Sequence, residues 1–267
     1  MFETAQLAPP FGVTMLPSQS KQILPILSGL SKKAIKKSFR FFGFELTRYR
    51  TPYKGPSPLL HHKIDLLFDV GANIGQYALS SRGEGYLGKI ISFEPLSTAH
   101  SVLKETAKSD SLWVIHERCA IGATNGEIEI NIAENSYSSS ILPMLQAHSD
   151  AAPQSVYVGR DSAKIIALDS IFYDYRTAKE RVFLKIDTQG FERAVLEGAK
   201  NCLRDIQAIQ LELSLVALYE GQELYDYFFS YLKNAGFEIW SLIPGFTDPR
   251  TGQSLQFDAV FVRPLPH

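Results

Sequence analysis

The residues Ile64–Tyr77 form the stretch IDLLFDVGANIGQY, and this stretch decides the fold of the chain. It begins with bulky apolar residues, which are typical of a buried β-strand, and it ends with Gly71 and Gly75 on either side of Asn73. After Gly75 the pattern becomes helical. Glycine lets the backbone approach a ligand closely, and the first turn of a helix offers unpaired N–H groups. A strand, a glycine-rich turn and a helix in this order therefore predict a nucleotide-binding corner.

An acidic residue follows the next expected strand, as such a corner requires. Residues 89–93 (KIISF) are this strand, and Glu94 comes directly after them, 19 positions beyond Gly75. In nucleotide-binding α/β folds an acid at this place accepts hydrogen bonds from ribose hydroxyls. The glycine turn and Glu94 together indicate a cofactor that contains a nucleoside. The alternative is a glycine turn that happens to lie beside a surface glutamate.

The spacing of the glycines narrows the choice of cofactor. The turn lacks the G-x-G-x-x-G pattern of dinucleotide sites, no lysine or arginine follows it, and the chain contains no G-K-[ST] motif. A pyrophosphate or a triphosphate is therefore not expected. Asp69 would repel a phosphate, but it could attract an ammonium group. These features favour a cofactor with a nucleoside and an amino acid moiety, such as S-adenosylmethionine.

Strands and helices alternate from residue 59 onward, which predicts a parallel sheet covered by helices. The expected strands are 64–70, 89–93, 112–116, 122–133, 165–168, 181–187, 208–213, 237–243 and 257–262. The expected helices are 75–81, 97–107, 191–203 and 223–235. Ser97 is expected to cap its helix, and 143–163 are expected to form a long loop. No helical pattern separates the last two strands, so we expect them to pair as an antiparallel hairpin.

Charge is unevenly distributed along the 267 residues, although the formal net charge is −1. Residues 1–54 contain nine Lys or Arg and two acids, which leaves 18 of the 27 basic and 26 of the 28 acidic residues for the remainder. We therefore expect a basic N-terminal arm at 1–58 and a second domain at 59–267. Within the arm, 23–46 have a basic amphipathic pattern. It indicates either a surface that binds anionic membrane weakly and in a salt-dependent way, or a helix packed on the domain with a solvated lysine face.

Composition argues against several classes of protein. Two cysteines, Cys119 and Cys202, make no disulfide framework, which favours a reducing compartment. The first twenty residues lack a signal-peptide pattern, and no apolar run is long enough to span a membrane. We expect a cytoplasmic protein, peripheral at most at the inner face of the membrane through 23–46. The near-zero net charge gives no indication of nucleic acid binding. The six histidines have no ligand spacing, so no metal is expected.

Several motifs in the same order resemble those of the FkbM-type S-adenosylmethionine-dependent methyltransferases, over about residues 60–265. The motifs are FDVGANIGQY (68–77), SFEP (92–95), YSSSIL (137–142), LKIDTQGFE (184–192), IQLELS (209–214), LYEG (218–221) and QFDAVFVR (256–263). The resemblance implies an α/β class I methyltransferase (Rossmann-like) fold. In this fold a seven-stranded, mostly parallel sheet carries an antiparallel C-terminal hairpin and has helices on both faces. It also implies O-methylation, typically of a sugar hydroxyl in a glycolipid, a polysaccharide or a glycosylated natural product.

The resemblance also assigns roles to single residues. The cofactor-binding residues that it implies are Asp69, Gly71, Ala72, Asn73, Gly75, Gln76, Glu94, Cys119, Ala120 and Asp187. The substrate-binding residues that it implies are Ser138, Ser139 and Ser140. At the position of Cys119 the family often has alanine, so this residue is a mild departure from the pattern.

Methyl transfer from a sulfonium to an alcohol is an in-line displacement, which requires alignment and exclusion of water. An alcohol is a poor nucleophile, so a general base should assist. Asp187 is the first candidate, because a carboxylate at the end of a parallel strand points into the crevice at that edge of the sheet. Glu212 is the second and His116 the third. The alternatives are that Asp187 only binds the cofactor, and that Glu212 and His116 are structural hydrogen-bonded residues.

The sequence alone leaves other functions open. One is an NAD-linked oxidoreductase, against which the D-x-G-x-N-x-G loop and the closing hairpin argue. Another is a non-catalytic module that binds the cofactor or a glycan, or that docks on a membrane through 23–46. For the enzyme itself, Asp187, Glu192 and Glu212 could hold Mg²⁺ through oxygen atoms as an alternative to metal-free catalysis.

Overall fold

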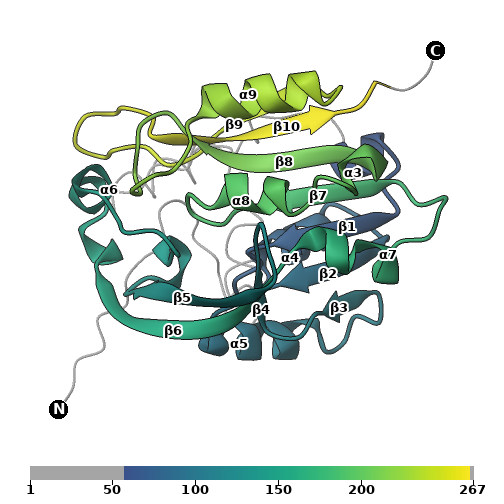
Figure 1. Cartoon of the computed structure of the whole chain (residues 1–267), viewed down its shortest axis with the longest axis horizontal. Coiled ribbons are helices and arrows are strands. Elements are labelled where there is room, and N and C mark those ends of the chain that lie inside the picture. The colour runs from purple at the N-terminus through teal and green to yellow at the C-terminus, as the bar shows by residue number, and fades with distance from the viewer. Residues whose placement is uncertain (1–56, 265–267) are drawn as a thin grey trace, which may run out of the picture. The chain divides into compact units, whose positions relative to one another are not determined.

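The computed structural model describes residues 57–264 of the chain (Figure 1), which fall within the compact unit Pro56–His267. The basic amphipathic stretch 23–46 and almost all of the expected arm 1–58 lie outside the described residues. Among the described residues no helix is long and apolar enough to cross a membrane.

A seven-stranded sheet forms the centre of the described unit, with the strand order β3-β2-β1-β7-β8-β10-β9. Its strands are β1 (Leu66–Val70), β2 (Lys89–Phe93), β3 (Trp113–Ile115), β7 (Val182–Ile186), β8 (Ile206–Ser214), β9 (Glu238–Pro244) and β10 (Gln256–Val262). All neighbours are parallel except β10, which is antiparallel to both β8 and β9. The predicted class I fold and its closing antiparallel hairpin are therefore confirmed.

Helices cover both faces of this sheet, as predicted (Figure 1). Side chains alternate along β1, so that Leu66 and Phe68 belong to one buried cluster and Leu67 belongs to another. The first cluster contains residues of α7 (Phe172–Tyr175), α8 (Glu192–Glu197) and α9 (Tyr225–Asn234). The second contains residues of α3 (Pro58–His61), α4 (Gln76–Gly83) and α5 (Ser97–Ala107). Central strands buried on both faces leave only their ends for chemistry.

The start of α5 differs from the prediction for Ser97. Leu96 occupies the N-cap position with an extended backbone, and Ser97 is the first helical residue. The N–H of Ser97 donates to Asp161 Oδ2 at 2.9 Å. An unpaired N–H at a helix N-terminus needs an acceptor, and here the acceptor comes from a distant strand, so the prediction that Ser97 caps the helix was wrong.

A second sheet of three strands, with the order β4-β6-β5, follows β3 in the chain. Its strands are β4 (Cys119–Ile121), β5 (Gly126–Ala133) and β6 (Tyr157–Ile166). The predicted loop 143–163 was therefore wrong in part, because it contains α6 (Gln146–Ala151) and most of β6. The run Gly159-Arg160-Asp161 hides the strand pattern of β6 in the sequence, and antiparallel pairing with β5 stabilises it.

Helix α8 is shorter than the predicted 191–203. It ends at Glu197, and Gly198 after it packs closely against a neighbour: a Cβ at Gly198 would overlap the carbonyl oxygen of Gly122. A 3₁₀ turn, Leu203–Asp205, then leads into β8. The close contact between α8 and the loop after β4 joins the two sheets.

Candidate active site

A cavity of about 200 Å³ lies at the carboxyl ends of the parallel strands. This edge is where open α/β sheets bind ligands. The main sheet contributes the residues after β1, after β2 and after β7, together with Glu212 near the end of β8. The second sheet contributes β4, Ile130 of β5 and the loop 137–141. The cavity therefore has one wall from each sheet.

Contacts with other residues of the protein determine the conformation of the glycine turn. Gly71 has a φ of +75°, and a Cβ there would overlap the carbonyl oxygen of Asp187. Gly75 has a φ of +97°, and a Cβ there would lie 2.6 Å from the ring of Trp113. Asn73 has a φ of +49°, a geometry that asparagine tolerates better than most residues. The turn thus needs glycine at both positions even before a cofactor binds.

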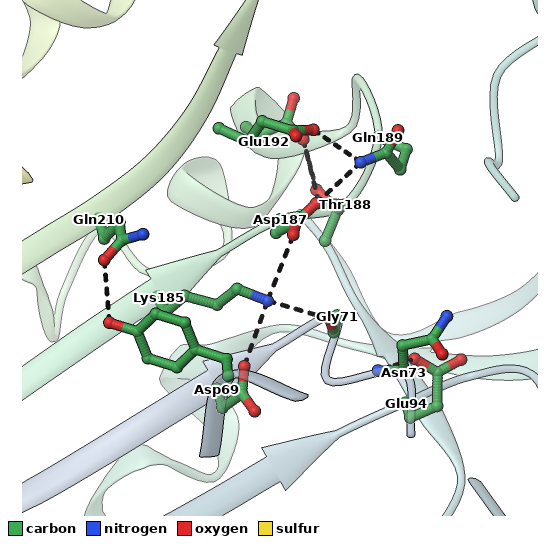
Figure 2. A network of polar contacts seen from close by, with 12 residues as sticks. Asp69, Gly71, Asn73, Glu94, Lys185, Asp187, Thr188, Gln189, Glu192 and Gln210 are labelled. Atoms are coloured by element: carbon green, nitrogen blue, oxygen red, sulfur yellow. Dashed lines mark hydrogen bonds and ion pairs between the residues drawn. The ribbon is translucent and has the colours of Figure 1, made fainter. Parts of the chain in front are cut away.

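Glu94 lies at the cavity in a fixed position. Its Oε2 accepts the N–H of Asn73 and its Oε1 accepts the N–H of Leu96, each at 2.8 Å. Burial raises the pKa of this carboxyl to about 7, although the two N–H groups oppose the rise. Figure 2 shows Glu94 next to Asn73, on the side of the cavity that the glycine turn forms. This arrangement suits the predicted role of Glu94 as the acceptor for ribose hydroxyls.

Asp69 does not line the cavity, and its cationic partner is a side chain of the protein. Asp69 pairs with Lys185 across β1 and β7, is fully buried, and has its Oδ1 3.3 Å from Lys185 Nζ. Burial raises the pKa of Asp69, and the ammonium of Lys185 opposes that rise. The sequence predicts that Asp69 attracts an ammonium group of the cofactor, whereas in the structure the ammonium beside Asp69 is that of Lys185.

Lys185 connects Asp69 to the cavity (Figure 2). Its Nζ donates to the carbonyl oxygen of Gly71 at 3.0 Å and lies 3.5 Å from Asp187 Oδ2. Burial lowers the pKa of Lys185, but the carboxylates of Asp69 and Asp187 outweigh it and raise the pKa overall. Lys185 therefore stays charged and holds the end of β7 against the glycine turn.

Asp187 and Glu212 face the cavity from neighbouring strands. One amide joins them, because Gln189 Nε2 donates to Asp187 Oδ1 at 2.9 Å and to Glu212 Oε2 at 2.6 Å. Gln256 Nε2 also donates to Glu212 Oε2, at 2.9 Å. Burial, and then the charges of Asp187 and Asp258, raise the pKa of Glu212 well above its ordinary value. Glu212 therefore favours its protonated form, whereas Asp187 has an ammonium beside it.

The three predicted serines have different surroundings. Only Ser139 lines the cavity, and its Oγ accepts the N–H of Ala133 at 3.0 Å. Ser138 is buried and bonds to Ser155, while Ser140 donates to the backbone oxygen of Gln189 at 2.6 Å. Tyr137, the first residue of the YSSSIL motif and not among the predicted site residues, also lines the cavity, and 60% of its surface is exposed.

The other predicted cofactor residues divide into two groups. Cys119 and Ala120 line the cavity from β4, and burial raises the pKa of the Cys119 thiol to about 12, so it presents a neutral surface. Ala72, Gly75 and Gln76 do not line the cavity.

His116, the third candidate base, also lies outside the cavity lining, and its Nδ1 is 2.8 Å from the carbonyl oxygen of Glu117. Among residues 57–264 no three His, Cys, Asp or Glu side chains are grouped as metal ligands would be.

Comparison with known protein families matches the methyltransferase FkbM domain to residues 69–239. The matched region begins at the glycine turn and contains Glu94, Asp187 and Glu212. Among curated proteins none matches the chain.

Solved structures with similar backbones include several methyltransferases. Fibrillarin from Aeropyrum pernix, in complex with natively bound S-adenosyl-L-methionine, is 11% identical, with 74% of this chain and 66% of that chain covered and a TM-score of 0.42. An rRNA methylase from Streptococcus thermophilus is 9% identical, with 82% of this chain and 100% of that chain covered and a TM-score of 0.42. A TehB-like SAM-dependent methyltransferase from Corynebacterium glutamicum is 10% identical, with 93% and 100% covered and a TM-score of 0.37. At these values the structures bear on neither the acceptor nor the site residues.

Proposed function

Because the chain belongs to the FkbM methyltransferase family, and is therefore an S-adenosylmethionine-dependent methyltransferase, we propose that its acceptor is a hydroxyl group of a sugar. A glycolipid, a polysaccharide or a glycosylated natural product would carry such a group. Family membership decides against the NAD-linked oxidoreductase and the non-catalytic module that the sequence alone left open.

The observation that carries this proposal is the division of the cavity into two halves. The glycine turn, Glu94 and Cys119 form a half that suits a nucleoside. Asp187 and Glu212 also line the cavity, and their two carboxyl groups share the amide of Gln189. A hydroxyl acceptor needs a hydrogen-bonding group that can take its proton, and this second half supplies one.

The wall from the second sheet supports a sugar as the carrier of the hydroxyl. Tyr137 offers an exposed aromatic ring, and Ser139 offers a hydroxyl on the same wall. A sugar ring presents apolar C–H faces as well as several hydroxyls, so it suits a cavity that combines an aromatic face with a few polar groups.

In the proposed reaction Asp187 is the general base. S-adenosylmethionine, held by the glycine turn and Glu94, would supply a methyl group on a sulfonium sulfur, and this sulfur would leave with the electron pair of the carbon–sulfur bond as the acceptor oxygen takes the methyl group. The hydroxyl proton passes to Asp187. The bond from Gln189 and the ion pair with Lys185 fix the carboxylate of Asp187, so the base is oriented before the acceptor arrives.

A direct test uses S-adenosylmethionine with a labelled methyl group and a panel of polysaccharides, glycolipids and glycosylated small molecules, with RNA and protein as further acceptors. We expect label in a carbohydrate, as a methyl ether that mass spectrometry locates on an oxygen. Transfer in excess chelator would also show that no divalent cation takes part. Label found only on nitrogen, on carbon or in RNA would contradict the proposal.

Substitution of Asp187→Asn tests the base. We expect turnover to fall by roughly 10²- to 10³-fold, because the amide cannot accept the proton. The affinity for the cofactor, measured by calorimetry, should change little. Asp258→Asn is the matched control, since Asp258 is a nearby carboxyl that does not line the cavity. If Asp187→Asn instead abolishes cofactor binding, Asp187 serves the cofactor and not the acceptor.

A further inference from the structure

Gln189 lines the cavity and is hydrogen-bonded to four other residues, three of which lie far from it in the chain. Its Nε2 donates to Asp187 and Glu212, and its Oε1 accepts the hydroxyl of Tyr219 at 2.9 Å. Its backbone oxygen accepts the hydroxyl of Ser140. The backbone of Gln189 has a φ of +54°, which is unusual for a residue with a long side chain. Such strain persists where the surroundings determine the conformation.

The surroundings allow the amide of Gln189 only one orientation. Among the hydrogen bonds of residues 57–264, Tyr219 is the only hydroxyl donor to this amide. The other neighbour of the Tyr219 hydroxyl is the carbonyl oxygen of Ser138, 3.4 Å away, which can only accept. A flipped amide would place Oε1 against two carboxyl groups and would leave the hydroxyl of Tyr219 facing an NH₂ group. The carbonyl end of Gln189 therefore faces Tyr219, and its NH₂ end faces the carboxyl groups.

Tyr219 itself has little freedom to move. It is fully buried, and its ring makes an edge contact with the ring of His148, with centroids 5.2 Å apart. It also covers Gly190, where a Cβ would come within 3.0 Å of the Tyr219 ring. The ring is thus packed against the residue that follows Gln189, which fixes the position of its hydroxyl.

We propose that Gln189, held by Tyr219, is a positioning residue whose single amide holds the side chains of Asp187 and Glu212 in place at the cavity. The proposal rests on the proposed function in that Asp187 is the base that this amide orients. Tyr219 acts through Gln189 and has no contact of its own with either carboxyl group among the hydrogen bonds of residues 57–264.

Charged neighbours, and not the shared amide, distinguish the two carboxyl groups. Lys185 Nζ lies 3.5 Å from Asp187 Oδ2. Glu212 has the amides of Gln189 and Gln256 as partners. Burial, and then the charges of Asp187, Asp258 and Glu192, raise the pKa of Glu212, while the hydrogen bond from Gln189 opposes this rise.

The test measures the titration of Glu212 directly and needs no acceptor. The side-chain carboxyl carbon of Glu212 is followed by NMR as a function of pH, in protein with ¹³C-labelled glutamate and with the signal assigned from Glu212→Gln. Gln189→Leu roughly keeps the size of the side chain but removes the N–H donor. That donor stabilises the charged form of Glu212. We expect the substitution to raise the pKa of Glu212 by about one unit.

Tyr219→Phe is the milder variant, because it removes only the hydroxyl and keeps the ring. We expect a smaller rise in the pKa of Glu212 in the natural background and no further rise in the Gln189→Leu background. Tyr86→Phe is the control, since Tyr86 is another buried tyrosine, whose hydroxyl bonds to the carbonyl oxygen of Lys89 away from the cavity. It should leave the titration unchanged.

Two results would overturn the proposal: no change with Tyr219→Phe, or an equal change in both backgrounds. Either result can occur while the enzyme still methylates a hydroxyl, so failure here is distinct from failure of the proposed function. Once an acceptor is known, kcat should fall about tenfold with Tyr219→Phe while cofactor affinity stays the same, and the losses from Tyr219→Phe and Gln189→Leu should not add.

Discussion

At the scale of single residues, Gly71 shows that the cofactor turn depends on its protein neighbours. Gly71 and Gly252 both have a φ of +75°, but only Gly71 has a neighbour that a Cβ would meet. We expect Gly71→Ala to lower the free energy of unfolding by about 2 kcal/mol more than Gly252→Ala does, because the carbonyl of Asp187 must move in addition to the backbone strain. Urea denaturation of both variants measures the difference. Equal losses from the two variants would show that the carbonyl of Asp187 can move without lowering the free energy of unfolding.

Contacts within the protein also explain which of the predicted cofactor-binding residues line the cavity. Asn73, Glu94 and Cys119 do line the cavity, because the order of strand, turn and helix largely places them there. Asp69 is different, since its partner Lys185 lies on another strand, and only the register of β1 against β7 brings the two together. That register is a tertiary property, and no local pattern in the sequence reports it.

At the scale of elements, the pair Asp69 and Lys185 joins β1 to β7 through a buried ionic contact. We expect Lys185→Met to lower the free energy of unfolding by about 3–5 kcal/mol, because it leaves the buried carboxyl of Asp69 without its counter-charge. The double variant Asp69→Asn and Lys185→Met should recover most of this loss. Thermal or urea unfolding of the single and double variants gives the comparison.

The exposed pair Lys108 and Glu105 is the matched control for this prediction. About three quarters of each side chain is exposed, 73% and 74%, so Lys108→Met should change stability by less than about 1 kcal/mol. Strictly additive losses from Asp69→Asn and Lys185→Met would contradict the idea that the two charges depend on each other.

Strands could be predicted where the apolar pattern is regular, and they were missed where pairing with another strand determines the structure. The seven strands of the main sheet could be predicted, because strands such as β1 and β7 are continuous apolar runs. Of strand β6 only the end was predicted, within the expected strand 165–168, because Gly159, Arg160 and Asp161 interrupt its pattern and pairing with β5 stabilises it. No local pattern singles out Gln189 and Tyr219 either, because the hydrogen bond between them joins residues 30 positions apart in the chain.

At the scale of the whole molecule, several carboxyl groups whose pKa is raised on folding make stability depend on pH. Burial raises the pKa of Glu94 and of Glu192 to about 7 and that of Asp258 to about 6, and it also raises the pKa of Glu212 well above its ordinary value. Between the unfolded and folded pKa values the folded protein binds more protons, so its free energy of unfolding falls as pH rises. His148, whose pKa burial lowers to about 4, has the opposite effect, but only below its ordinary value of 6.5.

We therefore expect the free energy of unfolding of the cofactor-free protein to fall between pH 6.5 and about pH 8, by on the order of 1 kcal/mol. Glu192→Gln should make this slope shallower, because Glu192 has one of the raised values and does not line the cavity. Urea denaturation at several pH values measures the slope. A free energy of unfolding that rises over this interval would mean that these carboxyl groups are charged in the folded protein at lower pH.

The position of the three-stranded sheet in the chain has a consequence for how this enzyme can diversify. The segment between β3 and β7 supplies one whole wall of the cavity, while the residues that hold the cofactor turn come from the main sheet. Insertions or exchanges in the β5–β6 hairpin leave every strand pairing of the main sheet intact. Under the proposed function this wall binds the acceptor, so we expect variation or grafting in this hairpin to change which molecule is methylated while the glycine turn stays the same, as antibodies vary their loops on a constant framework.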